Sequence, residues 1–281
     1  GYATVSRVVE TGKNVVAFRP GDLLCTRSGG KFEGVAAHFG GQAGHHVYNM
    51  GDGHLLLPPD AAENPLKFAP VEVAAISNRG VDSTRPQPNE LALVIGLGMI
   101  GFFEAELLRL KGCIVTVCDI AEQRVQAARE RGFNAVVLDG PDAKERLIAL
   151  SANNKYDIVA ECSGSTAGFE LAYSMLRDTL QKDANAAREA LTWPRLLLQG
   201  NYVDDISLNP CWFFRGEGII YLTPADRTLY DRKKIAEDIR SGKLDTTPFT
   251  QNVFTPAEMP AAYRKLQQRE INSAVCKWSG N

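Results

Sequence analysis

Two hydrophobic patterns follow one another along the chain. Up to residue 87, short apolar runs such as 4–10 and 23–26 alternate with turns rich in glycine and proline, which predicts the short strands of a compact β-rich unit. From Glu90 onward, short apolar runs alternate with stretches of helical length. This second pattern is typical of βαβ units, so we expect a mostly parallel sheet with helices on both faces.

The alternation in the second region gives bounds for its elements. The apolar runs predict strands at 91–95, 114–118, 135–138, 158–161, 195–199 and 218–222, and the segments between them predict helices at 99–111, 121–131, 142–151 and 166–177. A helix at 70–80 and a linker at 85–89 precede these units, and helices at 228–242 and 259–268 with a strand at 274–278 follow them. We therefore expect an α/β protein of two domains, residues 1–87 with 229–281, and residues 88–228.

Composition narrows the class of protein. The 281 residues are 44% hydrophobic and 23% charged with a net charge of −2, so nothing points to nucleic acid or an anionic membrane surface. No apolar run reaches the roughly 18 residues of a membrane-spanning helix. The six cysteines are scattered without a C-x-x-C pair, which favours reduced thiols in a cytoplasmic protein. Because Gly1 stands in place of an initiator methionine, we expect that the chain was cut or that its beginning is missing.

The most informative stretch is a glycine turn between a predicted buried strand and a predicted helix. Gly96 allows the tight turn, Gly98 lets the backbone approach a pyrophosphate, and Gly101 lets the helix pack closely on the strand. Met99 and Ile100 complete the turn, and the helix that begins there offers free N–H groups to phosphates. A glycine turn without a ligand is the alternative, but the full strand–turn–helix context favours a dinucleotide.

The kind of dinucleotide follows from the end of the next strand. Asp119 stands where a carboxylate accepts hydrogen bonds from ribose hydroxyls and repels a 2′-phosphate, which favours NAD over NADP. Arg124, one helical turn further on, leaves NADP open. Residues at the carboxyl ends of two later strands are expected to line the same crevice, and these are Cys162, Ser163, Gly164, Gln199, Gly200 and Asn201. Cys162 fits simple packing better than a reactive thiol.

The order of these pieces resembles the medium-chain dehydrogenase/reductase family, in which alcohol dehydrogenases occur. Residues 1–10 followed by 18–22 look like the family's G-H-E-x-x-G-x-V-x-E and F-x-x-G-D segments, and residues 156–164 look like its D-x-V-x-E-x-x-G strand. Residues 126–136 and 256–263 resemble two further family segments. The resemblance implies a Rossmann domain with a doubly wound parallel sheet and a GroES-like, β-rich catalytic domain that is incomplete at its N-terminus.

The chain departs from the zinc-using members of that family. Their Gly-His-Glu is Gly1-Tyr2-Ala3 here, and a further carboxylate ligand corresponds to Asn78. Residues 26–48 lack the family's four closely spaced cysteines. Zinc needs several nitrogen, sulfur or carboxylate ligands that converge, so we expect a zinc-independent member without a metal site. Gly1-Tyr2 and the segment 38–43 are similar to the bacteriochlorophyllide a dehydrogenase branch, which implies NAD-linked oxidation of a hydroxyethyl group on a chlorin.

Without zinc, a side chain must take or give the hydroxyl proton. His46 and His45 are candidate bases because histidine titrates near neutral pH, although adjacent strand residues face opposite sides and capping or solvent-exposed roles stay open. Tyr2 stands at the position of the family's metal ligand and is a candidate to hydrogen-bond a substrate oxygen. The alternative is that Tyr2 is a buried tyrosine that fills the space of the missing ligand.

These features favour a zinc-independent NAD(H)-dependent oxidoreductase that transfers hydride between nicotinamide and a secondary alcohol or ketone. The alternatives are an NADPH-dependent enoyl or quinone reductase and a non-catalytic NAD-binding protein. A homodimer through the edge strand at 218–222 is a further expectation from the family resemblance. The charged segment 178–192 fits a solvated helix or a partner site.

Overall fold

The computed structural model describes residues 3–26, 41–48, 53–178, 193–203, 205–207, 219–222, 225–227 and 229–278. They divide into two compact units, residues 1–75 with 226–281 (unit 1) and residues 76–225 (unit 2). The division falls inside helix α1 (Val71–Thr84), before the linker where the sequence places it. Predictions about Tyr2, His38 and residues 179–192 lie outside the described residues.

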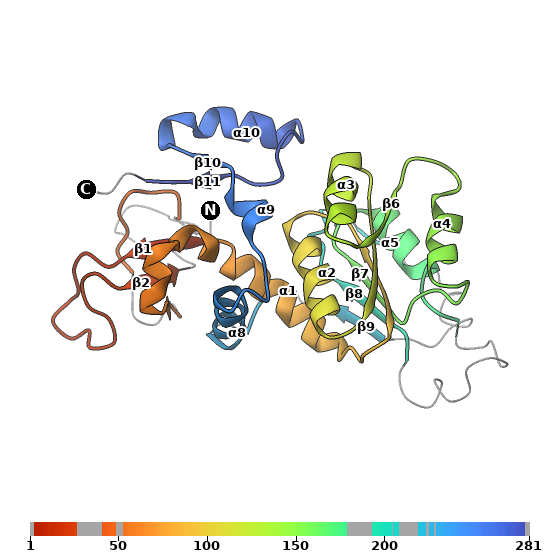
Figure 1. Ribbon diagram of the computed structural model, residues 1–281, viewed down its shortest axis with the longest axis horizontal. Helices are drawn as coiled ribbons and strands as arrows, with labels where there is room; N and C mark the ends of the chain where they lie inside the picture. The colour runs from red at the N-terminus through yellow and green to blue at the C-terminus, as the bar shows by residue number, and fades with distance from the viewer. Residues whose placement is uncertain are drawn as a thin grey trace. The chain divides into compact units, whose positions relative to one another are not determined.

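Unit 2 is built on a six-stranded sheet that is parallel throughout (Figure 1). The strands are β4 (Leu91–Ile95), β5 (Ile114–Asp119), β6 (Asn134–Val137), β7 (Ile158–Glu161), β8 (Arg195–Leu198) and β9 (Ile219–Leu222). Their spatial order β6-β5-β4-β7-β8-β9 reverses direction at β4, as in the doubly wound dinucleotide-binding fold. The expected α/β fold is therefore confirmed, and ligands in such sheets bind outside the carboxyl ends of the strands at the reversal point.

In the part of the chain that the structure describes, four helices connect strands of this sheet. They are α2 (Met99–Leu110), α3 (Glu122–Glu130), α4 (Ala143–Leu150) and α5 (Thr166–Ser174). Because β4 to β6 and β7 to β9 step in opposite directions, right-handed crossovers place α2 and α3 on one face and α5 on the other (Figure 1). The strands at the centre are the most buried, with Leu93, Val159 and Leu196 fully removed from solvent.

Unit 1 contains two small sheets. Strands β1 (Thr4–Arg7), β2 (Leu23–Thr26) and β3 (Leu55–Leu56) form an antiparallel sheet, and β10 (Val253–Phe254) pairs in parallel with β11 (Val275–Cys276). The helices are α8 (Leu229–Arg240), α9 (Thr247–Thr250) and α10 (Met259–Gln267), with 3₁₀ turns at Pro59–Glu63, Pro65–Phe68 and Pro256–Glu258.

Several elements end at other residues than the sequence predicts. The strand predicted at 4–10 ends at Arg7, although Val8 still exchanges backbone hydrogen bonds with Gly21 and Asp22. Helix α1 runs four residues past the predicted end at Gly80 and stops where Arg85 takes a positive φ of 49°. The helix predicted at 166–177 ends at Ser174, because Leu176 pairs with Tyr156 in an isolated bridge.

The edge of the large sheet is exposed. Strand β9 is the last strand in the order, and its Leu222 side chain is 72% exposed. A homodimer through this edge stays a prediction. None of the helices in the described part of the chain has the length and hydropathy to cross a membrane.

Candidate functional site

The glycine turn lies where the sheet reverses, at the carboxyl end of the central strand β4. Gly96 has φ +92°, a left-handed conformation that favours glycine, and its N–H donates to the Cys118 carbonyl at 2.8 Å. A Cβ on Gly101 would lie 1.9 Å from the Gly96 carbonyl oxygen and 3.2 Å from the Cβ of Cys162. The turn, the start of α2 and the loop after β7 therefore pack against one another with no room for a side chain at Gly101.

Gly98 differs from Gly96 and Gly101, the other two glycines of the turn, because it faces open space. A Cβ built there meets no protein atom within 4 Å, and its φ of −66° suits any residue. Gly98 is also the N-cap of α2, which has no side-chain cap and no acid in its first turn. A helix N-terminus of this kind attracts anions through its free N–H groups and its dipole. The residues present therefore fit a pyrophosphate.

Asp119, at the end of β5, is tied to the glycine turn. Its Oδ2 accepts from the Leu97 N–H at 2.6 Å and from Arg124 Nη1 at 3.4 Å, and its Oδ1 accepts from the Ala121 N–H at 2.8 Å. A carboxylate has about four acceptor positions, so one position on Oδ1 stays open for a ribose hydroxyl. The Arg124 guanidinium offsets part of the negative charge that would repel a 2′-phosphate.

The other predicted cofactor residues lie in two loops that touch each other. Cβ positions at Gly164 and Gly200 would lie 2.5 Å from the Asn201 carbonyl oxygen and 2.4 Å from the Gly164 nitrogen, respectively. The Gly96 turn packs on the Ser163 nitrogen, 2.9 Å from a Cβ at Gly96. The structure thus gathers Gly96, Gly98, Met99, Ile100, Gly101, Cys162, Ser163, Gly164, Gln199, Gly200 and Asn201 around the ends of β4, β7 and β8. Their role in binding a cofactor stays a prediction.

A buried carboxylate fixes the loop after β7, and sequence reasoning did not single it out. Glu161 accepts hydrogen bonds from the backbone N–H groups of Ser163 at 2.8 Å and Gly164 at 3.1 Å, and from the hydroxyls of Ser163 and Tyr202. Burial, followed by the bond to Glu161, raises the pKa of Tyr202. The sequence signal for such an anchor is an acid at the end of an apolar strand that is followed within three residues by a Ser-Gly pair, here Ser163 and Gly164.

The histidine candidates lie in unit 1 and differ in burial. His45 is exposed, whereas His46 is partly buried and stacks on Tyr48 with ring centroids 5.3 Å apart. Its Nε2 is buried without a hydrogen-bond partner among the described residues. Burial lowers the pKa of His46 and a backbone bond at Ala43 partly opposes this, so the imidazole is neutral at neutral pH and able to accept a proton.

Tyr48 and Thr26 are neighbours of His46 that sequence reasoning missed. The Thr26 hydroxyl donates to the Tyr48 oxygen at 3.0 Å and also contacts the Thr4 hydroxyl, because Thr4 and Thr26 are paired across β1 and β2. The His54 ring also lies near Tyr48, with ring centroids 4.9 Å apart. The strand pairing brings Thr4 to Thr26, and the Thr26–Tyr48 contact spans 22 residues, so spacing alone could not show these contacts.

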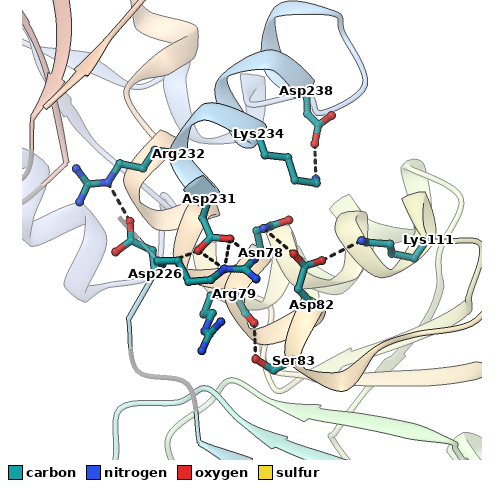
Figure 2. A network of polar contacts seen from close by, with 11 residues as sticks. Asn78, Arg79, Asp82, Ser83, Lys111, Asp226, Asp231, Arg232, Lys234 and Asp238 are labelled. Carbon is teal, nitrogen blue, oxygen red and sulfur yellow. Dashed lines mark hydrogen bonds and ion pairs between the residues drawn. The ribbon is translucent and has the colours of Figure 1, made fainter. Parts of the chain in front are cut away.

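The described residues do not offer a zinc donor set. No three of their His, Cys, Asp or Glu side chains converge as ligands would. In unit 2, the Asn78 amide donates to Asp82 at 3.3 Å, and Asp82 in turn pairs with Lys111 at 2.9 Å (Figure 2). An amide held by a carboxylate that a lysine already neutralises does not suit a zinc ion, and we assign no catalytic step to zinc.

Together the sheet order, the glycine turn and the acid at the end of β5 have the arrangement found in doubly wound dinucleotide-binding folds such as those of dehydrogenases. Comparison with known proteins supports this class. Residues 99–180 match the family model described as zinc-binding dehydrogenase.

Relatives and solved structures agree with that family. The chain is 27% identical to D-arabinitol dehydrogenase 1 of Uromyces fabae over 74% of its own length and 57% of that protein's, and 27% identical to a putative D-xylulose reductase of Agrobacterium fabrum over 97% and 79%. The chain therefore spans little more than half of the first of these relatives. An alcohol dehydrogenase from Thermus sp. ATN1 has the same fold, with a TM-score of 0.78 at 17% identity over 99% of this chain and 84% of that one.

Proposed function

We propose that this protein is an NAD(H)-dependent oxidoreductase that transfers hydride between nicotinamide and a secondary alcohol or ketone without zinc. The observation that carries the proposal is the glycine turn with Gly98 open to solvent and Asp119 anchored beside it. The names of the relatives, an arabinitol dehydrogenase and a xylulose reductase, support a secondary alcohol as the substrate class. The hydroxyethyl group of a chlorin stays an alternative substrate from the sequence resemblance.

The residues of unit 2 have separate tasks in this proposal. The N-terminus of α2 binds the pyrophosphate, and Asp119 orients the adenosine ribose. The loops that end in Gly164 and Asn201 flank the nicotinamide, which supplies or accepts the hydride when the cofactor is bound. Glu161 keeps the first of these loops in place through its backbone acceptor bonds.

Proton transfer is assigned to unit 1. His46 is proposed as the base that accepts the hydroxyl proton, because its neutral imidazole has a buried Nε2 with no hydrogen-bond partner among the described residues. Tyr2 and His45 stay predictions for the same step.

Replacing His46 with Gln is expected to lower kcat about 100-fold or more, as loss of a general base does, while leaving the Kd for NADH unchanged. An unchanged kcat would assign the base to another residue.

The function is tested by hydride transfer. Purified protein is expected to oxidise members of a panel of sugar alcohols and simple secondary alcohols with NAD, followed by reduced-nicotinamide absorbance, at a metal content well below one zinc per chain. A clear preference for NADPH with enones or quinones would favour the reductase alternative. Saturable NADH binding without any turnover would favour the non-catalytic alternative, and one zinc per chain would refute the metal-free chemistry.

Asp119 gives a prediction about cofactor choice. Replacing Asp119 with Ser removes a charged acceptor of a ribose hydrogen bond and weakens NADH binding by about 10- to 100-fold, since such bonds contribute about 1.5–3 kcal/mol. NADPH should lose far less, because the carboxylate that repels a 2′-phosphate is removed while the positive charge of Arg124 stays nearby. Fluorescence titration with both cofactors measures the ratio of the two Kd values. Arg129→Ala, which removes an exposed guanidinium from the same helix, is the matched control and should leave the ratio unchanged.

A further inference from the structure

Glu104 is a fully buried carboxyl in the middle of α2. The Cys162 thiol donates to its Oε2 at 3.0 Å. Its Oε1 is buried without a hydrogen-bond partner among the described residues. Burying a carboxylate with so little compensation is costly, whereas a neutral carboxylic acid tolerates such a site. Neither the fold nor the proposed binding site as described so far requires this group.

Among the described residues, the groups that face Glu104 include no cation. Glu161 and Cys162 face it from the end of β7, and the Gln199 amide lies on the same side at the end of β8. Helix α1 contributes Gly80, where a Cβ would lie 3.1 Å from Glu104 Oε1 and 2.2 Å from Gln199 Oε1. Burial raises the pKa of Glu104 to about 8, the bond from Cys162 lowers it, and the Glu161 carboxylate raises it. Glu104 therefore carries a proton at neutral pH.

The partner of Glu104 is the residue on which the glycine turn rests. Gly101, one helical turn before Glu104, packs against the Cβ of Cys162, and the Cys162 carbonyl carbon lies 3.1 Å from a Cβ at Gly96. Burial, then the Glu104 carboxyl, raises the pKa of the Cys162 thiol well above its usual range, so Cys162 stays a protonated donor. A change at Glu104 therefore reaches the turn through a single side chain.

We propose that Glu104 is a positioning residue for dinucleotide binding, because its protonated form holds Cys162 against the glycine turn and loss of the proton releases that support. The inference rests on the proposed binding of a dinucleotide at this turn. Once ionised, the carboxylate lies beside Glu161 with one thiol donor, and the segment Cys162–Gly164 moves to let water reach it. A turn without its support binds the pyrophosphate less well.

Protonation of Glu104 should make both the folding stability and the binding of a dinucleotide decrease as the pH rises. A carboxyl whose pKa is raised on folding keeps its proton in the folded state while the unfolded chain has lost its own, so folding stability falls as the pH rises from the unfolded pKa toward about 8 and then levels off. Binding that requires the protonated form weakens above about pH 8, by up to tenfold in Kd for each further pH unit.

Fluorescence titration with NADH across the pH range of about 6 to 9.5 tests the proposal. The wild-type protein should bind with a constant Kd up to about pH 8 and progressively more weakly above it. Glu104→Gln keeps the shape of the neutral acid and should bind at every pH as the wild type does at low pH. Glu104→Ala should bind weakly at every pH, because Cys162 loses its acceptor.

Two controls separate the possible failures. Glu106→Gln removes another buried carboxyl of α2, one that pairs with Arg109 and with Arg131 at 3.0 Å, and it should keep the wild-type pH step. The same pH profile in wild type and Glu104→Gln, with thermal melts showing both folded, overturns the role of Glu104 and leaves nucleotide binding intact. Absence of NADH binding by the wild type even at low pH refutes the proposed function and this role together.

Discussion

Adding the same methyl group at two glycines of one turn is expected to give opposite results. Gly101→Ala should lower the free energy of unfolding by about 3 kcal/mol, the upper part of the usual range for overpacking, because the new Cβ would lie 1.9 Å from a backbone oxygen. Gly98→Ala should leave stability unchanged or raised by about 0.5 kcal/mol, since its φ of −66° suits alanine and removing a glycine limits the unfolded chain.

NADH binding should reveal an effect of Gly98→Ala that the free energy of unfolding does not. Gly98→Ala puts a methyl group where the pyrophosphate is expected and should weaken binding about tenfold or more, the equivalent of one lost hydrogen bond to a charged group. Chemical unfolding and NADH titration on the same preparations measure both quantities. Gly132→Ala serves as a control for binding only. Gly132 faces open space just after α3, so this variant should keep the Kd for NADH, while its φ of +82° means that alanine there should cost some stability. Tight NADH binding by a folded Gly98→Ala protein would place the pyrophosphate elsewhere.

The turn and its strands could be predicted because their signals are local. The apolar run that forms β4, the glycines and the acid at Asp119 lie within one stretch of chain, and the sequence-based bounds of β4 and β7 agree with the structure residue for residue. Backbone geometry in a βαβ unit depends on short spacings, so a pattern of this kind also specifies which strand ends meet.

The features that need long-range contacts could not be predicted in the same way. Glu104 and Cys162 are 58 residues apart, and only the packing of α2 on β7 shows that the acid has a thiol as its partner. The sequence does contain a trace of this site, since a glutamate stands in a helix whose neighbours Phe103 and Ala105 are fully buried. Tyr48, beside His46, was missed for the same reason, because its contact with the Thr26 hydroxyl spans 22 residues of the chain.

A second feature that no local pattern shows is the buried ion cluster of unit 1. Arg232 is only 1% exposed, and its Nε lies 2.6 Å from Glu72 and 2.9 Å from Asp226 (Figure 2 shows the second contact). Its Nη1 donates to the Gly53 carbonyl at 2.7 Å. The cluster joins α8, the start of α1 and the segment before β3, so one guanidinium neutralises two buried carboxylates from separate parts of the chain.

Removing that guanidinium should have the largest effect on stability of any single change to the charged residues of unit 1. Arg232→Met is expected to cost about 3–5 kcal/mol in the free energy of unfolding, because two buried carboxylates both lose the guanidinium that contacts them. Urea unfolding measures this.

The triple variant R232M/E72Q/D226N tests whether the loss comes from charge or from packing. Removing both carboxylates together with the guanidinium should restore most of the stability, because a buried ion cluster replaced as a whole is close to neutral in free energy while a broken one is not. Arg240→Ala, on the same helix but in an exposed pair with Asp60, should leave the unfolding midpoint in place. If the triple variant is as unstable as Arg232→Met, the guanidinium stabilises unit 1 by filling space, and the two carboxylates are not the reason that α8 carries an arginine there.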